Sequence, residues 1–130
     1  NQIFKVPEAY KLKYFQFASG NTMVSTSTVE IEHEGKTVKE ASCGDGPVDA
    51  AFKAIEKASG MDIKLKDYSI KSIGSGKDAV GEVTVKIENN GRIFTSKGMS
   101  TDVVEASAAA FVNSINRIYF DINREKAVQK

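Results

Sequence analysis

The chain has few of the residues that build covalently or metal-stabilised folds. Its 130 residues include one cysteine, one histidine, two prolines and no tryptophan. Cys43 has no second cysteine with which to form an internal disulfide, and a cysteine-based zinc site cannot be assembled from one thiol. We therefore expect an ordinary hydrophobic core in a single domain, for which this length suffices.

The sequence also lacks a surplus of either charge and any long apolar run. Eighteen basic residues stand against seventeen acidic ones, and the lysines are scattered among the carboxylates. Nucleic-acid binding needs a basic stripe, and a membrane span needs about 20 consecutive apolar residues. We expect neither partner, and we expect a soluble, cytoplasmic protein. The first residue is Asn1 rather than Met, so we expect a piece of a longer polypeptide.

An internal repeat is present. Three blocks recur in the same order, each about 55 residues later in the chain. The pairs are "YKLKYFQF" (10–17) with "IKLKDYSI" (63–70), "TVEIEHEGKT" (28–37) with "TVKIENNGRI" (84–93), and "GPVDAAFKAI" (46–55) with "DVVEASAAAF" (102–111). The second copy carries extra residues within "SIGSGKDAVGE" (72–82).

The first two blocks of each copy predict a β-meander. Val29 and Ile31 are separated by a polar residue, which is typical of a half-buried strand. Gly35 and Asn90-Gly91 stand where tight hairpin turns need positive φ. Broken alternation in the first strand of each copy indicates bulges or twist.

The third block of each copy predicts a helix. Gly46 and Pro47 suit the N-cap and first position of the first helix, which Gly60 ends. Asp102 followed by Glu105 resembles a capping box at the start of the second helix. The alanine-rich stretch 106–110 should let this helix approach a neighbour closely.

These elements predict an α+β fold made of two βββα units with internal pseudo-twofold symmetry. Each sheet should be covered on one face by a helix. The repeats span about 10–60 and 61–122, residues 1–9 form a linker, and 123–130 form a polar tail. One such unit alone would be marginal, so the halves should share a core or pair with another chain.

Three possible reactive groups have weak support. His33 lies between two glutamates beside a turn, where we expect it to be solvated. Cys43 has no convenient base, and we expect a small buried thiol. "GSGK" (74–77) lacks the full spacing of a phosphate-binding loop. An independent enzyme is therefore the least supported function.

The loop before the first helix is the stronger candidate for a binding site. Gly44, Gly46 and the first helical amides should form a set of donors at the positive end of a helix dipole, where an anion or small carboxylate would bind. Asp45 and Asp49 lie at the same end and could accept a ligand ammonium. Alternatively, both carboxylates only complement the helix dipole.

The irregular loop at 72–79 breaks the symmetry of the repeat and follows the strand that carries Tyr68. Loops of this kind often carry function. With apolar groups from Tyr68, Ile73 and Ala79, a pocket between the two loops would suit a zwitterion with a hydrocarbon tail, such as an aliphatic amino acid.

Three segments resemble the C-terminal regulatory domain of 2-isopropylmalate synthases, which citramalate synthases share. They are "GDGPVDAAFKAI" (44–55), "LKDYSIKSIGSGKDAVGEVTV" (65–85) and "STDVVEASAAAFVNSINR" (100–117), and the resemblance covers roughly 10–121. It implies a duplicated βββα homodimer that binds leucine, or isoleucine in citramalate synthases, as a feedback inhibitor. Catalysis would belong to an upstream TIM barrel that uses a divalent metal ion to condense acetyl-CoA with a 2-oxo acid. No cofactor is expected in this fragment.

The resemblance also implies which residues bind the inhibitor. They fall in the two loops and before the second helix: Gly44, Asp45, Gly46, Pro47, Asp49, Tyr68, Ser72, Ile73, Asp78 and Ala79, with Ser100 and Thr101 as further candidates. Two alternatives to the leucine-binding domain stay open. One is an isoleucine-binding regulatory domain, and the other is a purely structural dimerisation domain.

Overall fold

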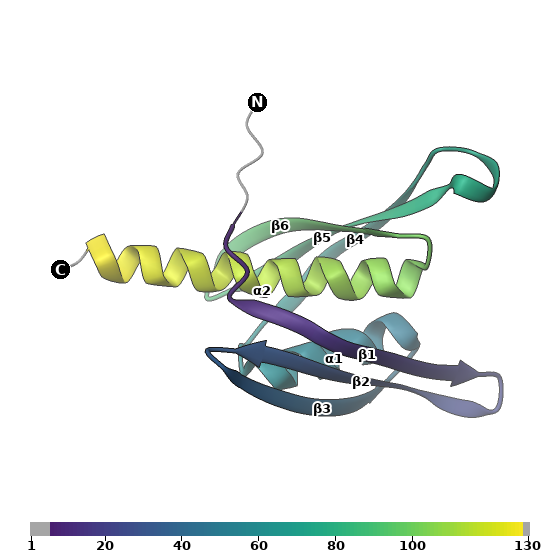
Figure 1. Ribbon diagram of the computed structural model, residues 1–130, viewed down its shortest axis with the longest axis horizontal. Helices are drawn as coiled ribbons and strands as arrows, with labels where there is room; N and C mark the ends of the chain where they lie inside the picture. The colour runs from purple at the N-terminus through teal and green to yellow at the C-terminus, as the bar shows by residue number, and fades with distance from the viewer. Residues whose placement is uncertain (1–5, 129–130) are drawn as a thin grey trace.

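The duplicated βββα architecture is confirmed in the computed structural model, which describes residues 6–128 apart from the side chains of Asp78 and Val128 (Figure 1). The first unit comprises β1 (Tyr10–Gly20), β2 (Met23–His33), β3 (Lys36–Gly44) and α1 (Pro47–Ser59). The second comprises β4 (Lys64–Ile73), the short 3-10 helix η1 (Gly76–Asp78), β5 (Val80–Asn89), β6 (Arg92–Ser100) and α2 (Val103–Val128). The expected linker lies only partly within the described residues, from Val6 to Ala9.

Each unit is an antiparallel meander in which the strands follow chain order. The β2–β3 turn has positive φ at Glu34 and Gly35, and the β5–β6 turn has it at Asn90 and Gly91, as the primed hairpin turns require. Register shifts interrupt the pairing of β1 with β2 and of β4 with β5, so the expected bulges are present. Inward-facing residues of β2 and β5, such as Val29 and Val85, are fully buried.

The helix ends follow the expected pattern with one difference. α1 has Gly46 as N-cap, proline in its first turn, and Gly60 in the left-handed conformation at its C-cap. In α2 the carboxylate of Asp102 accepts hydrogen bonds from the N–H groups of Val104 (2.8 Å) and Glu105 (3.1 Å). The Glu105 side chain instead accepts a bond from the Ser100 hydroxyl, so the capping box is only half formed.

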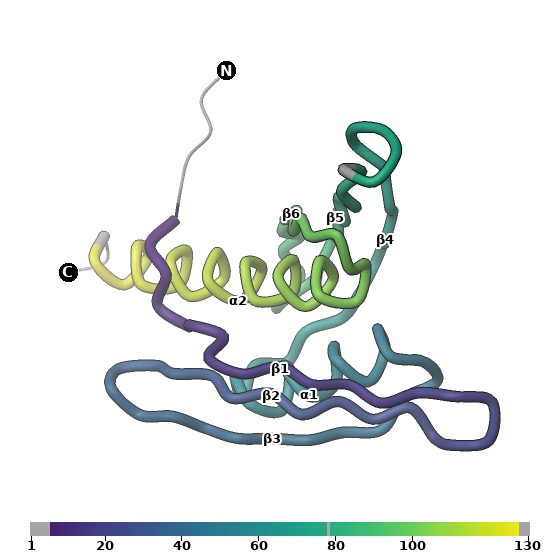
Figure 2. The backbone as a smooth tube through the Cα atoms, turned by 45° about the vertical axis from the view of Figure 1, so that its right-hand side comes forward, coloured from purple at the N-terminus to yellow at the C-terminus, as the bar shows by residue number. Residues whose placement is uncertain are grey.

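The two helices lie between the two sheets (Figures 1 and 2). α1 contacts β1, β2 and β3, whereas α2 contacts β5, β6, β1 and α1. Phe52 of α1 and Phe111 of α2 meet edge to face with ring centroids 5.1 Å apart, so the two repeats share one core. Among the described helices, none combines the length and apolar character that a bilayer span requires.

The alanine-rich start of α2 packs closely on β6, as predicted. A Cβ added to Gly98 would run into the backbone of Ala106 and Ala110. The fully buried Ala106, Ala108 and Ala110 leave room for this approach. Gly98 is therefore required by packing, since its φ is not positive.

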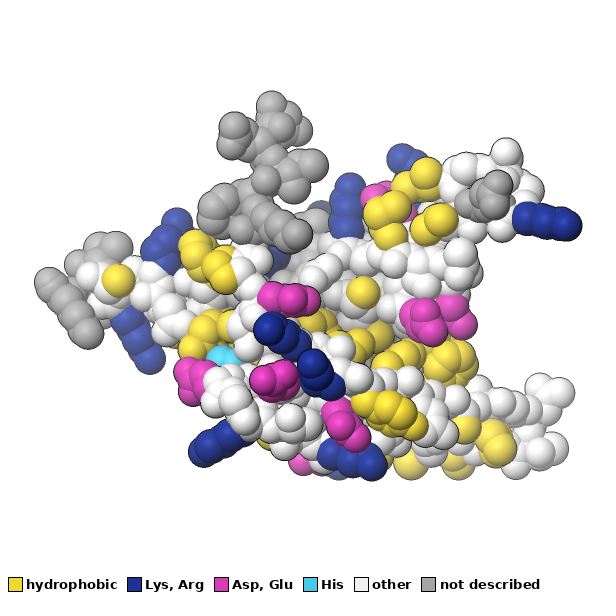
Figure 3. All heavy atoms as spheres, in the orientation of Figure 1, with side chains coloured by type: hydrophobic (Ala, Val, Ile, Leu, Met, Phe, Trp, Pro, Cys, Tyr) yellow, Lys and Arg dark blue, Asp and Glu magenta, His cyan; other side chains and the backbone are white. Residues whose placement is uncertain are grey.

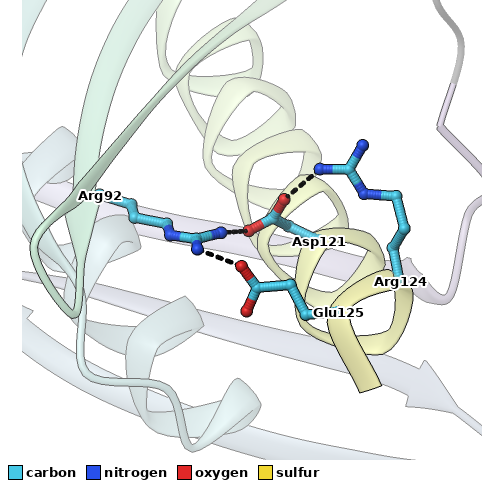
Figure 4. Close-up of polar contacts among 4 residues, drawn as sticks. All are labelled: Arg92, Asp121, Arg124 and Glu125. Atoms are coloured by element: carbon cyan, nitrogen blue, oxygen red, sulfur yellow. Dashed lines mark hydrogen bonds and ion pairs between the residues drawn. The ribbon is translucent and has the colours of Figure 1, made fainter. Parts of the chain in front are cut away.

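The segment expected to be a polar tail continues α2 as far as Val128. Arg92, at the start of β6, forms ion pairs with Asp121 and Glu125, and Arg124 pairs with Asp121 at 2.9 Å (Figure 4). These pairs tie the last turns of the helix to the sheet. Residues 129–130 lie outside the described residues.

Candidate functional site

The first turn of α1 presents backbone donors without a side-chain cap. Gly46 has an extended backbone (φ 173°), and no side-chain hydrogen bond caps the helix. The N–H groups of Val48 and Asp49 have no acceptor within the helix because of their position in the first turn. The corresponding donors of α2 are satisfied by Asp102. The α1 end is therefore the better placed of the two to receive a carboxylate.

Two residues of this loop already have structural roles. One carboxylate oxygen of Asp49 accepts the N–H of Asp45 at 2.9 Å and lies 3.1 Å from the Lys53 ammonium. The bond from the Asp45 amide, supported by Lys53, lowers the pKa of Asp49 against the opposing effect of burial. A Cβ at Gly44 would lie 2.8 Å from the Cα of Ala50, so glycine lets β3 meet α1.

The predicted residues of β4 lie on different faces of the strand. Tyr68 and Ser72 pair with Val85 and Gly81 and point to the side of the sheet that carries α2, whereas Ile73 points to the opposite side. Ala79 follows η1 and is half-buried. The Asp78 side chain lies outside the described part of the chain.

Tyr68 is linked to the N-terminal part of α2. Its hydroxyl lies 2.7 Å from that of Ser107, which donates its own proton to the Val103 carbonyl at 2.8 Å. Tyr68 must therefore be the donor to Ser107. Sequence reasoning missed Ser107, although a lone hydroxyl within the alanine-rich stretch was an available signal.

Ser100 and Thr101 differ in their surroundings. The Ser100 oxygen accepts the N–H of Asp102 at 3.1 Å while its hydroxyl donates to Glu105, so this side chain helps to cap α2. Thr101 is exposed.

The structure brings the predicted segments to one end of the molecule without joining them. The loops before α1 and α2 and the loop after β4 all lie at the right-hand end in Figure 1, where the last of these projects from the body. Among the described residues, no hydrogen bond or ion pair connects the loop at 44–49 with residues 68–79.

Two expectations about reactive side chains are wrong. Cys43 is exposed, because its pairing with Thr26 turns it to the face of β3 away from α1. His33 is half-buried rather than solvated: its ring stacks on Tyr10 with centroids 4.0 Å apart, and Nδ1 lies 3.0 Å from the Ala9 carbonyl oxygen. Since a carbonyl only accepts, Nδ1 carries the proton in this contact.

A further residue that sequence reasoning missed connects the two repeats. Asn116 of α2 accepts the N–H of Tyr10 at 2.6 Å and donates to the Tyr10 carbonyl at 3.0 Å. We call this pair of bonds the Asn116 clamp. Its signal in the sequence was a polar residue beside Ile115 and Ile118 in an otherwise apolar stripe.

A hollow of about 160 Å³ lies on the C-terminal half of α2, away from the predicted loops. It is lined by Val6, Phe94, Arg117, Phe120, Asp121 and Arg124. Across the described residues, no cluster of His, Cys, Asp and Glu could hold a metal ion.

Comparison with known proteins finds relatives that share one name. Two similar relatives, both named 2-isopropylmalate synthase, are from Clostridium kluyveri (66% identical over 93% of this chain) and Ruminiclostridium cellulolyticum (53% over 90%). A third of the same name, from Heliobacterium modesticaldum, is 50% identical over 88%. The chain spans about a quarter of the length of these relatives, with 24%, 23% and 22% covered.

The comparison with protein families covers nearly the whole chain. The matching family is described as the LeuA allosteric (dimerisation) domain, and the match runs over residues 1–119. The duplicated βββα fold and the relatives' names are consistent with this match. The chain belongs to the LeuA allosteric (dimerisation) domain family.

Proposed function

We propose that this domain binds leucine as a feedback inhibitor of a 2-isopropylmalate synthase and that it forms a homodimer. The observation that carries the proposal is the uncapped first turn of α1, which contrasts with the capped first turn of α2. Free amides at the positive end of a helix dipole suit the carboxylate of an amino acid. The relatives' names support leucine over isoleucine as the ligand.

In this proposal each loop contacts a different part of the ligand. The amides of the α1 turn hold the carboxylate, and the exposed carboxylate of Asp45 accepts the ammonium. The segment from Tyr68 to Ala79 supplies the apolar contacts. Because no hydrogen bond or ion pair joins the two loops among the described residues, ligand binding would draw them together, and inhibition would follow from different affinities for two arrangements.

The remainder of the enzyme is also part of the proposal. An upstream TIM barrel would condense acetyl-CoA with a 2-oxo acid, 2-oxoisovalerate for leucine synthesis, with a divalent metal ion bound in that barrel. The enzyme would work in the cytoplasm. The domain described here would contribute regulation and dimer contacts only.

A purely structural dimerisation domain is the second candidate, and specific contacts favour it. Asp49 is held by the Asp45 amide and Lys53, Gly44 is explained by packing, and Ser100 helps to cap α2. Each of these residues would be needed even if no ligand were bound. Only a binding measurement separates the two candidates.

Isothermal titration with leucine, isoleucine and valine tests the proposal, with Gly46→Val as the diagnostic variant. Nothing lies within 4 Å of a Cβ at Gly46, so valine fits the free domain and interferes only with a ligand on the turn. We expect leucine to bind best, and Gly46→Val to weaken its affinity at least tenfold, about 1.4 kcal/mol.

Gly20→Val is the matched control, because its Cβ would meet only the flexible Met23 side chain at 3.4 Å. This variant should bind leucine as the unmodified chain does. Absence of heat with all three amino acids at millimolar concentration would favour the structural candidate. Unchanged leucine affinity in Gly46→Val would move the site away from this loop.

A further inference from the structure

β4 has the sequence pattern of a half-buried strand, but most of it is exposed: among the described residues, Tyr68 is the member of this strand that packs against the core. Leu65, Tyr68, Ile70 and Ser72 pair with inward-facing residues of β5 and point to the same side of the sheet. We call these four residues the β4 inner face. Leu65 is 38% exposed and Ile70 is 52% exposed, and only Tyr68 reaches α2. Apart from this side-chain contact, neither helix packs against β4 within residues 6–128.

The first repeat shows how the same face is buried elsewhere in the molecule. Leu12 and Phe15 of β1 match Leu65 and Tyr68 of β4 in the repeat. Both β1 side chains pack against the core, and α1 and α2 both contact β1. Tyr68 packs against the core as Phe15 does, but Leu65 is not covered as Leu12 is. Ile70 matches Phe17, which is half-buried, whereas Ile70 is exposed. The inward-facing positions Leu65 and Ile70 of β4 are therefore less covered than their counterparts in β1.

Charge is confined to the opposite side of β4. Lys64, Asp67 and Lys71 pair across the strands with Glu88, Lys86 and Glu82 on the outer face. The β4 inner face has no charged residue. Figure 3 shows side chains of both charges over the lower layer, β1–β3, with hydrophobic ones along the seam between the layers and also on the right-hand part of that layer. Burying the β4 inner face would therefore desolvate no ion.

We propose that the β4 inner face is the surface on which a second copy of this chain packs. The proposal rests on the homodimer proposed above, because the family is a dimerisation domain. A twofold dimer uses the same patch on both subunits, so the patch must be compatible with itself. An uncharged apolar face meets this requirement, since it brings no like charges together.

Two isoleucines of the same sheet provide a matched test. Ile70 on the β4 inner face and Ile93 on the outer face of β6 are each 52% exposed. Sedimentation equilibrium of the 130-residue chain should show a dimer that Ile70→Glu weakens at least 100-fold. Ile93→Glu should leave the dimer unchanged. Circular dichroism should show the same secondary structure in all three proteins.

Hydrogen exchange of the unmodified chain gives a second measurement, which does not depend on whether a variant folds. Above the dimer dissociation constant, exchange within 64–73 should slow, while exchange within 92–100 should not. A dimer that survives Ile70→Glu, or protection confined to β6, would refute the β4 inner face as the dimer surface. Neither result would contradict the homodimer itself. A chain that stays monomeric at every concentration, with and without leucine, would overturn both.

Discussion

Asn116 holds both backbone polar groups of a residue 106 positions away in the sequence. Tyr10 is nearly buried, and burial, with Tyr119 and Glu34 nearby, raises the pKa of its phenol. His33 stacks on the Tyr10 ring, and Tyr119 donates a hydrogen bond to Glu34 at 3.1 Å. The start of β1, the β2–β3 turn and α2 therefore meet at one cluster.

Removing the Asn116 clamp should be costly because it leaves two buried backbone groups without partners. Asn116→Ala should lower the free energy of unfolding by about 2–4 kcal/mol, measured by urea denaturation. Asn113→Ala, which removes an exposed bond to the Lys97 carbonyl, should cost about 1 kcal/mol or less. Equal losses in the two variants would contradict a special role for the clamp.

Asp49 predicts an acid-dependent loss of stability. Its pKa is lowered in the folded state, chiefly by the Asp45 amide, so folding is favoured when the carboxylate is charged. That contribution is present above the pKa of the unfolded chain, about 3.9, and is lost as the pH falls through the lower folded value.

Asp49→Asn should therefore flatten the fall in urea midpoint below about pH 4. Asp45→Asn, which removes the neighbouring exposed carboxylate but keeps the amide, is the control. A pH profile for Asp49→Asn that matches the unmodified chain would refute this assignment.

At the scale of elements, β6 and α2 approach each other closely at Gly98. Gly98→Ala should destabilise by about 2–4 kcal/mol, because the added Cβ meets backbone atoms that cannot move aside. Gly81→Ala on the neighbouring strand should change stability by less than about 0.5 kcal/mol, since its Cβ would lie 3.4 Å from a Val103 methyl group. Thermal unfolding of both variants checks the contrast.

The sequence predicts those elements whose cause is local. Positive φ at Gly35 and Gly91, proline at the start of α1 and Asp102 at the N-cap of α2 each depend on a few neighbouring residues. The last turns of α2 were missed because they depend on Arg92, which lies 29 residues before Asp121. The face occupied by Cys43 was also wrong, since β3 has too weak an apolar alternation to fix it.

The candidate binding loops are less predictable from the sequence. The α1 turn was predicted correctly as a glycine-rich helix start, and the two faces of β4 follow from its register. Which side chains would surround a ligand depends on how separate loops approach each other, and no local pattern encodes that. Leucine binding therefore stays a prediction.

At the scale of the whole molecule, the two repeats should unfold together because they share a core. Phe111→Ala in α2 removes a fully buried ring that touches Phe52 of the first repeat, and should cost about 3–5 kcal/mol. Native-state hydrogen exchange should show equal losses of protection in β2 and β5. A loss restricted to β5 would mean that the repeats are separate folding units.

The Asn116 clamp should also affect how the domain resists a pulling force on its N-terminal end. The chain crosses α2 before it enters β1 (Figures 1 and 2), and the clamp fastens it there. A force applied ahead of Tyr10 would be resisted first by the second repeat's helix. It would not simply peel β1 from the edge of its sheet.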